Sequence, residues 1–128
     1  MSWLRKDQPP EVWETEVQPE GDIEAAQRIR EICVAAEAIV GRMATLRGRK
    51  AEAEGERYQA AIKCALEIAQ NMSDDAMRDI SVSQLILLCV KANHLKTARV
   101  LLRAIRSDKI RGELIAESPV LIDQDAAN

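Results

Sequence analysis

With 128 residues and a mass of 14.3 kDa, the chain has the length of one domain and can bury a core without disulfides or metal ions. Hydrophobic residues make up 47% and charged residues 30%, which excludes a wholly disordered chain, and the formal net charge is only −3. The longest apolar run, Leu85 to Val90, is too short to cross a membrane, and the first residues lack the apolar stretch of a signal peptide. We therefore expect a cytoplasmic protein.

Residues 1–21 are predicted to form an acidic, proline-containing flexible arm. They contain three of the four prolines and no apolar period that could support a helix. Trp13, Thr15 and Val17 alternate with glutamates, a pattern that leaves open a short docked strand. Whether the arm docks is not decided by the sequence.

Residues 22–72 are predicted to form a long antiparallel helical hairpin. Asp22 is the predicted N-cap, and the stretch Arg47 to Glu56, with bases, a glycine and then acids, is typical of a break between two helices. One continuous helix is the alternative, since single glycines cost only about 1 kcal/mol each. Two apolar stripes follow helical spacing, at Ala25, Ile29, Ile32, Ala36, Ile39, Met43 and Leu46, and at Tyr58, Ile62, Ala65, Ala69 and Met72.

Residues 73–118 are predicted to add a three-helix segment. After a short helical turn at 73–79, Ser81 and Gln84 match a capping box, which predicts a helix start at Val82 and an apolar, central helix behind it. Asn93 is the expected left-handed C-cap before a fourth helix. A short fifth helix ends at Ser118-Pro119, and residues 119–128 form a tail.

An internal repeat links two parts of this region. A shift of 33 residues places Ala65 on Ala98, Asp75 on Asp108, and Arg78 on Arg111. Residues 82–115, with Leu95, Ala98 and Leu102 at turn and packing positions, resemble a tetratricopeptide-like helical-hairpin repeat. Departures are Ile86, where that family keeps a small residue, and the lack of a closing proline. The resemblance implies a scaffold that binds proteins and has no catalytic role.

The residues that could carry catalysis or bind a metal do not form a recognisable motif. The single histidine, His94, is five residues from Cys89, a spacing that does not place both side chains on one helical face. Cys33, Cys64 and Cys89 are far apart in sequence, lie in apolar helical stretches and are expected to be buried free thiols in a reducing compartment. The glycines are scattered singly, so there is no phosphate-binding loop. We expect no cofactor, no metal and no enzymatic activity.

The most distinctive surface is basic. Lys96, Arg99, Arg103 and Arg106 are spaced three, four and three residues apart, which places them on one face of the predicted fourth helix. Residues 91–111 carry seven bases and one acid, whereas residues 7–24 carry seven acids and no base. A solvated helix face is the simplest interpretation. The functional interpretations are that this basic face binds an acidic protein partner, the acidic arm itself, or the phosphates of a nucleic acid.

These patterns together predict an all-α protein, as a helical bundle or a short helical-repeat array, that acts as a non-enzymatic interaction or adaptor module. The long stripe of residues 25–46 exceeds what one short partner helix covers, so we expect a homodimer through the hairpin. A nucleic-acid-binding regulator that uses the same basic face is the alternative. The sequence does not name the partner or the pathway.

Overall fold

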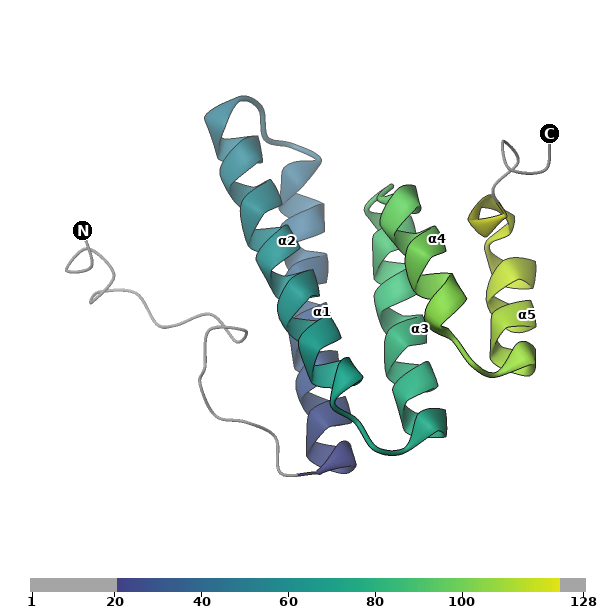
Figure 1. Cartoon of the computed structure of the whole chain (residues 1–128). Helices are drawn as coiled ribbons and strands as arrows, with labels where there is room; N and C mark the ends of the chain where they lie inside the picture. Colours follow the sequence, from purple (N-terminus) through teal and green to yellow (C-terminus); the bar gives the residue numbers. More distant parts are fainter. Residues whose placement is uncertain (1–20, 123–128) are drawn as a thin grey trace.

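The computed structural model describes residues 21–122 of the chain. Within that range the chain forms five α-helices and one 3-10 turn and no strand, which confirms the predicted all-α class (Figure 1). Residues 1–20 of the predicted arm and residues 123–128 of the predicted tail lie outside the described range. The elements are α1 (Asp22–Met43), α2 (Arg49–Gln70), α3 (Asp75–Lys91), α4 (Leu95–Ala104), α5 (Asp108–Glu117) and η3 (Pro119–Leu121).

The first two helices form the predicted antiparallel hairpin rather than one continuous helix. The chain turns at residues 44–48, where Gly48 has a φ of 64°, a left-handed conformation that glycine adopts without strain. The turn therefore lies at the beginning of the predicted break, and α2 already includes Gly55. A single glycine inside a helix of 22 residues is tolerated because the packed face of the helix outweighs its cost.

The apolar stripe of α1 is covered within the chain. Both α2 and α3 pack against α1. The stripe therefore no longer argues for the homodimer that we predicted from it, and the homodimer stays a prediction. The stripe residues that this packing buries are Ala25, Ile29, Ile32, Ala36 and Ile39.

Helix α3 is the central helix, as predicted, but it begins earlier. It contacts α1, α2, α4 and α5, and Ile86 and Leu88 are buried. Its N-cap is Asp74, whose carboxylate accepts a hydrogen bond of 2.9 Å from the backbone N–H of Met77. The predicted start at Val82 is wrong. No helix breaker separates Asp74 from Ser81, so the helix runs through the sequence that resembles a capping box.

Two predicted N-caps, Ser81 and Asp22, are also wrong. Ser81, the predicted N-cap, is buried inside α3, and the preceding residue Ile80 is 53% exposed. Asp22 is the first residue of α1 and not its N-cap, because the cap position is Gly21 and no side chain caps it. The Asp22 carboxylate instead binds the loop between α2 and α3.

The helices stack as hairpins in two layers. In the view of Figure 1, α2 and α4 lie in front, and α1 and α3 lie behind them. The 33-residue shift found in the sequence superposes the start of α3 on the start of α5. Asp74 and Ser107 cap these helices in the same way, by accepting from the backbone N–H of Met77 and Ile110. The internal repeat thus corresponds to a repeated structural unit, which consists of the end of one helix, a loop, and the capped start of the next helix.

A carboxylate from an earlier helix closes each of these two loops. Asp22 of α1 accepts hydrogen bonds from the backbone N–H groups of Ser73 and Asp74, at 2.9 and 2.7 Å. Asp79 of α3 accepts from the next loop, from Arg106 at 3.2 Å and Ser107 at 2.9 Å. Both loops are therefore held by the same kind of contact, in which a carboxylate of an earlier helix accepts hydrogen bonds from two backbone N–H groups of the loop.

The helices between residues 21 and 122 include none that is both long enough and apolar enough to span a membrane.

Candidate interaction surface

Helix α4 carries the predicted basic face, and a tight turn sets its position. Asn93 has a φ of 59°, which confirms the predicted left-handed C-cap after α3. The N–H of His94 donates to the carbonyl of Cys89 at 2.7 Å, and the N–H of Asn93 donates to that of Val90 at 3.0 Å. This pair of bonds is a Schellman motif, and it reverses the chain so that α4 returns along α3.

Side chains of α2, α3 and α4 pack around the turn between α3 and α4. The His94 ring packs edge-on against the Tyr58 ring, with centroids 5.7 Å apart, and its Nε2 lies 2.9 Å from the hydroxyl of Thr97. The Tyr58 hydroxyl donates to the sulfur of Cys89 at 3.4 Å, and burial raises the pKa of both groups. His94 thus lies in the turn between α3 and α4 and occupies the N-cap position before Leu95, the first residue of α4.

Two of the four predicted basic residues have structural partners. Arg99 is only partly exposed, and its guanidinium donates two hydrogen bonds, of 3.2 and 2.9 Å, to the carbonyl of Val120. This contact fixes the C-terminal turn, whose Leu121 is buried beneath it. Arg106 is exposed but forms an ion pair of 3.0 Å with Asp75. Arg99 therefore does not belong to a freely solvated helix face, because its side chain holds η3 against α4.

The other two basic residues remain available on the surface. Lys96 and Arg103 are exposed, and neither forms an ion pair or a hydrogen bond with any residue between 21 and 122. Between them lies Val100, which is 54% exposed. It follows Lys96 by four residues and precedes Arg103 by three, so the three side chains share one helix face. We call Lys96, Val100 and Arg103 the α4 strip.

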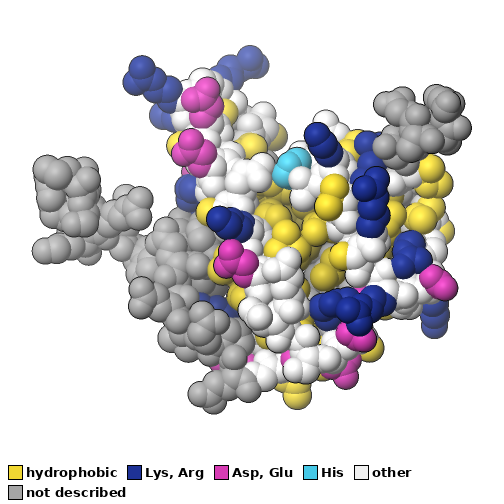
Figure 2. All heavy atoms as spheres, in the orientation of Figure 1, with side chains coloured by type: hydrophobic (Ala, Val, Ile, Leu, Met, Phe, Trp, Pro, Cys, Tyr) yellow, Lys and Arg dark blue, Asp and Glu magenta, His cyan; other side chains and the backbone are white. Residues whose placement is uncertain are grey.

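Val100 was not among the predicted binding residues. The signal was present, because an apolar residue that is out of phase with the Leu95, Ala98, Leu102 stripe must point to solvent. Figure 2 shows Lys and Arg side chains gathered over α4 and α5, with hydrophobic side chains between them.

The bases that flank α4 add less charge than their number suggests. Lys91 forms an ion pair with Glu37, and Arg111 forms one of 2.7 Å with Asp108. Arg111 also donates to the carbonyl of Ile105. Lys109 is exposed on α5. Neighbouring acids therefore offset much of the local positive charge, which leaves the α4 strip as the exposed cationic surface of this helix.

A shallow trough runs between α2 and α4 beside the α4 strip. Its volume is about 350 Å³, and Figure 2 shows hydrophobic side chains between the two helices. Thr97 of α4 forms one wall, so an occupant of the trough would also approach Lys96. The lining residues are Gln59, Ile62, Lys63, Leu66, Glu67, Gln70 and Thr97.

Metal-ligating side chains do not gather in the described part of the chain. Among residues 21–122 no group of three His, Cys, Asp or Glu side chains is placed to hold an ion. Comparison with known protein families, with curated protein sequences and with solved structures finds no match to this chain. The tetratricopeptide-like resemblance of residues 82–115 therefore stays a prediction, and the chain's function must be argued from its own surfaces.

Proposed function

We propose that this protein is a non-enzymatic, cytoplasmic adaptor that binds an acidic protein through the α4 strip. The observation that carries the proposal is the exposed Val100 between the unpaired cations Lys96 and Arg103. An apolar centre with a charged rim is the usual composition of a protein-binding surface. The cations steer an acidic partner to the surface, and Val100 supplies the area that loses water on binding.

The chemistry of the strip favours a protein over a nucleic acid. Nucleic acid binding depends on several phosphate contacts, and binding of single strands also depends on aromatic stacking. The strip contains two cations and an aliphatic side chain, and Tyr58, the one Phe, Trp or Tyr among residues 21–122, is buried. Nucleic acid binding stays the alternative that the experiment must separate.

The test compares two charge-reversed variants. One is Lys96→Glu with Arg103→Glu, which leaves the contact between Arg99 and Val120 intact. The matched control is Arg47→Glu with Lys50→Glu, two exposed bases near the turn between α1 and α2. A partner identified by native pull-down is purified, and its dissociation constant is measured for each protein at 50 and 200 mM salt, beside a duplex DNA and a single-stranded RNA.

We expect the α4 variant to bind the partner at least about tenfold more weakly and with a smaller dependence on salt. The control should bind like the original protein. Equal losses in both variants, or no loss in either, would contradict the proposal. Tighter binding to DNA or RNA than to any protein would favour the alternative.

The predicted homodimer is a separate proposal and needs its own measurement. Sedimentation equilibrium at micromolar concentration should give twice the chain mass of 14.3 kDa. A mass of one chain would remove the dimer without affecting the role of the α4 strip.

A further inference from the structure

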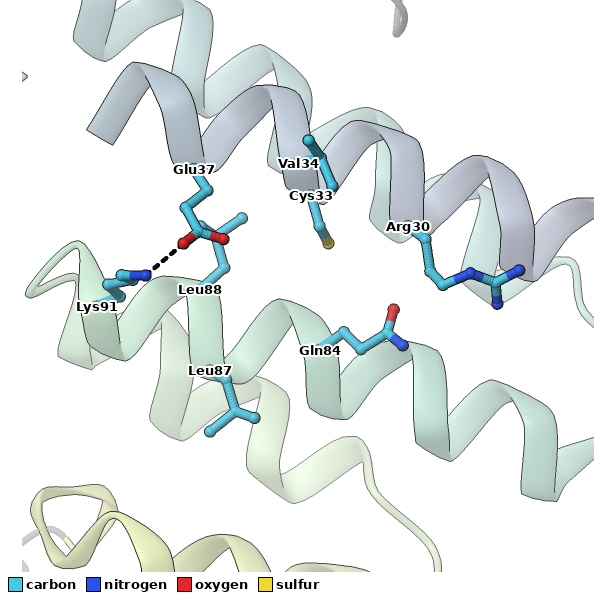
Figure 3. A pocket seen from close by; sticks show the side chains of 8 residues that line it. All are labelled: Arg30, Cys33, Val34, Glu37, Gln84, Leu87, Leu88 and Lys91. Carbon is cyan, nitrogen blue, oxygen red and sulfur yellow. Dashed lines mark hydrogen bonds and ion pairs between the residues drawn. The ribbon is translucent and has the colours of Figure 1, made fainter. Parts of the chain in front are cut away.

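The back layer of the molecule has a groove that the proposed function does not use. It lies between α1 and α3, has a volume of about 380 Å³, and is apolar in its middle (Figure 3). Val34 is 71% exposed there, although it is a branched aliphatic residue. Burial raises the pKa of the Cys33 thiol to about 11, helped by the nearby Cys89 and Glu37, so Cys33 adds no charge at neutral pH. The lining residues are Arg30, Cys33, Val34, Glu37, Gln84, Leu87, Leu88 and Lys91.

Two polar features define what the groove accepts. The side-chain oxygen of Gln84 is shielded from solvent and has no hydrogen-bond partner among residues 21–122, and Figure 3 shows the Gln84 side chain extending toward α1. A buried acceptor without a donor is costly, so turning the Gln84 amide to present this oxygen to the groove is favoured when an occupant brings an N–H group. At one end Glu37 and Lys91 neutralise each other. Arg30 is exposed at the other end, so the groove also favours an acidic neighbour.

Tryptophan flanked by acids matches this chemistry. Its ring is the largest apolar side chain, and its indole N–H is a hydrogen-bond donor that accepts nothing. The chain has two tryptophans, Trp3 and Trp13, both within residues 1–20. Trp13 has Glu11, Glu14 and Glu16 around it, whereas Arg5 and Lys6 follow Trp3.

The distance along the chain also selects Trp13. It precedes Asp22 by nine residues, which span up to about 30 Å when extended. Along α1, Arg30 and Glu37 lie roughly 12 and 22 Å from Asp22 by the helical rise. Trp13 therefore reaches the whole groove. Trp3 is about twice as far from α1, which lowers its effective concentration roughly threefold.

We propose that the N-terminal segment of this chain docks in the α1/α3 groove, with the Trp13 ring between Val34 and Leu87 and its indole N–H on the Gln84 oxygen. Glu14 and Glu16 then lie near Arg30. A short tether gives a local concentration in the millimolar range, so a weak contact is enough to keep the segment bound. The groove is then an internal docking site on the opposite layer from the α4 strip.

Tryptophan fluorescence tests this directly, because Trp3→Phe leaves Trp13 as the only tryptophan. Emission and acrylamide quenching of this variant are compared with those of a synthetic peptide of residues 1–20 carrying the same change. We expect emission at shorter wavelength and a quenching constant at least about threefold lower in the full chain than in the peptide.

Two substitutions of exposed valines locate the docking site. In the Trp3→Phe background, Val34→Glu should return Trp13 to the values of the peptide, because it places a charge in the groove and repels the acidic segment. Val100→Glu, on the α4 strip, should leave the emission and the quenching of Trp13 unchanged. Circular dichroism must show that both variants keep their helix content.

Four outcomes would overturn the proposal. Trp13 as accessible as in the peptide would mean that the segment does not dock. Protection that survives Val34→Glu would place it elsewhere. Protection lost through Val100→Glu would place it on the α4 strip. Protection that grows with protein concentration between 1 and 100 μM would mean that a second copy supplies the segment.

Discussion

The loops between α2 and α3 and between α4 and α5 are built alike but placed differently. In each, a carboxylate of an earlier helix accepts from two successive backbone N–H groups, and the residue at the second of these positions caps the next helix. Asp22 holds the first loop from the partly exposed start of α1. Asp79 holds the second from inside α3 and is 2% exposed. The hydrogen bonds of Asp79 should therefore contribute more to the free energy of unfolding than those of Asp22, because water cannot replace a buried hydrogen bond.

The largest expected effect is that of removing the buried carboxylate. Asp79→Ala leaves the N–H groups of Arg106 and Ser107 without their acceptor, and we expect a loss of about 3 to 5 kcal/mol in the free energy of unfolding. Urea denaturation monitored by circular dichroism measures it. A loss below about 1 kcal/mol would show that the α4–α5 loop does not depend on Asp79.

Removing the exposed counterpart should matter less. Asp22→Ala takes away the acceptor for Ser73 and Asp74, but water can reach both N–H groups, so we expect a loss of about 1 to 2 kcal/mol. Part of it comes from the lost negative charge in the first turn of α1. Comparing the two alanine variants in one denaturation series tests the contrast. Equal losses in the free energy of unfolding would mean that burial does not distinguish the contacts of Asp79 from those of Asp22.

The helix caps of the two loops should contribute equally. Asp74→Ala and Ser107→Ala each remove one hydrogen bond to the first turn of a helix, at a cost of about 1 kcal/mol. Ser81→Ala serves as the control, since Ser81 lies inside α3 and caps nothing. Melting temperatures of the three variants measure the difference. A larger loss for Ser81 than for Asp74 would restore the helix start at Val82 that the capping box predicted.

The smallest effect is expected near the turn between α1 and α2. There the Glu54 carboxylate accepts hydrogen bonds from Arg42 of α1 and from Arg57 of α2. Burial opposes ionisation of Glu54, but the hydrogen bonds from both arginines outweigh it and hold the pKa of the carboxyl below its ordinary 4.5. A lowered pKa stabilises the fold above about pH 4.5, and this contribution disappears as the pH falls through the folded-state value.

We expect Glu54→Gln to lose less than about 1 kcal/mol at pH 7 and to show a flatter stability profile below pH 4.5 than the original protein. Thermal melts between pH 3 and pH 7 measure both. An identical acid limb in the two proteins would contradict the role of the two arginines.

Most of the architecture followed from apolar spacing. The stripes from Ala25 to Ile39 and from Tyr58 to Ala69 are buried where helical periodicity placed them, because such a face has no other way to leave water. The chirality of the turn at Asn93 was also readable, since asparagine tolerates a positive φ.

Long-range polar contacts could not be predicted in this way. Asp79 meets a loop 27 residues away, and Arg99 meets the carbonyl of Val120, 21 residues away. Nothing in the local sequence marks either residue, because a carboxylate in a helix and an arginine on a basic face look the same whether or not a partner arrives. The two available cations of the α4 strip were predicted, but their distinction from Arg99 and Arg106 needed the fold.

The placement of Tyr58 makes the junction of the two hairpins visible to spectroscopy. Tyr58 belongs to α2, yet its ring contacts His94 in the turn between α3 and α4, and its hydroxyl donates to Cys89 in the last turn of α3. It is the only aromatic residue of Trp, Tyr or Phe type between residues 21 and 122. In a variant in which Trp3 and Trp13 are replaced by leucine, the near-ultraviolet signal therefore reports on this one contact. Separation of the hairpins can then be followed while far-ultraviolet helix content stays unchanged.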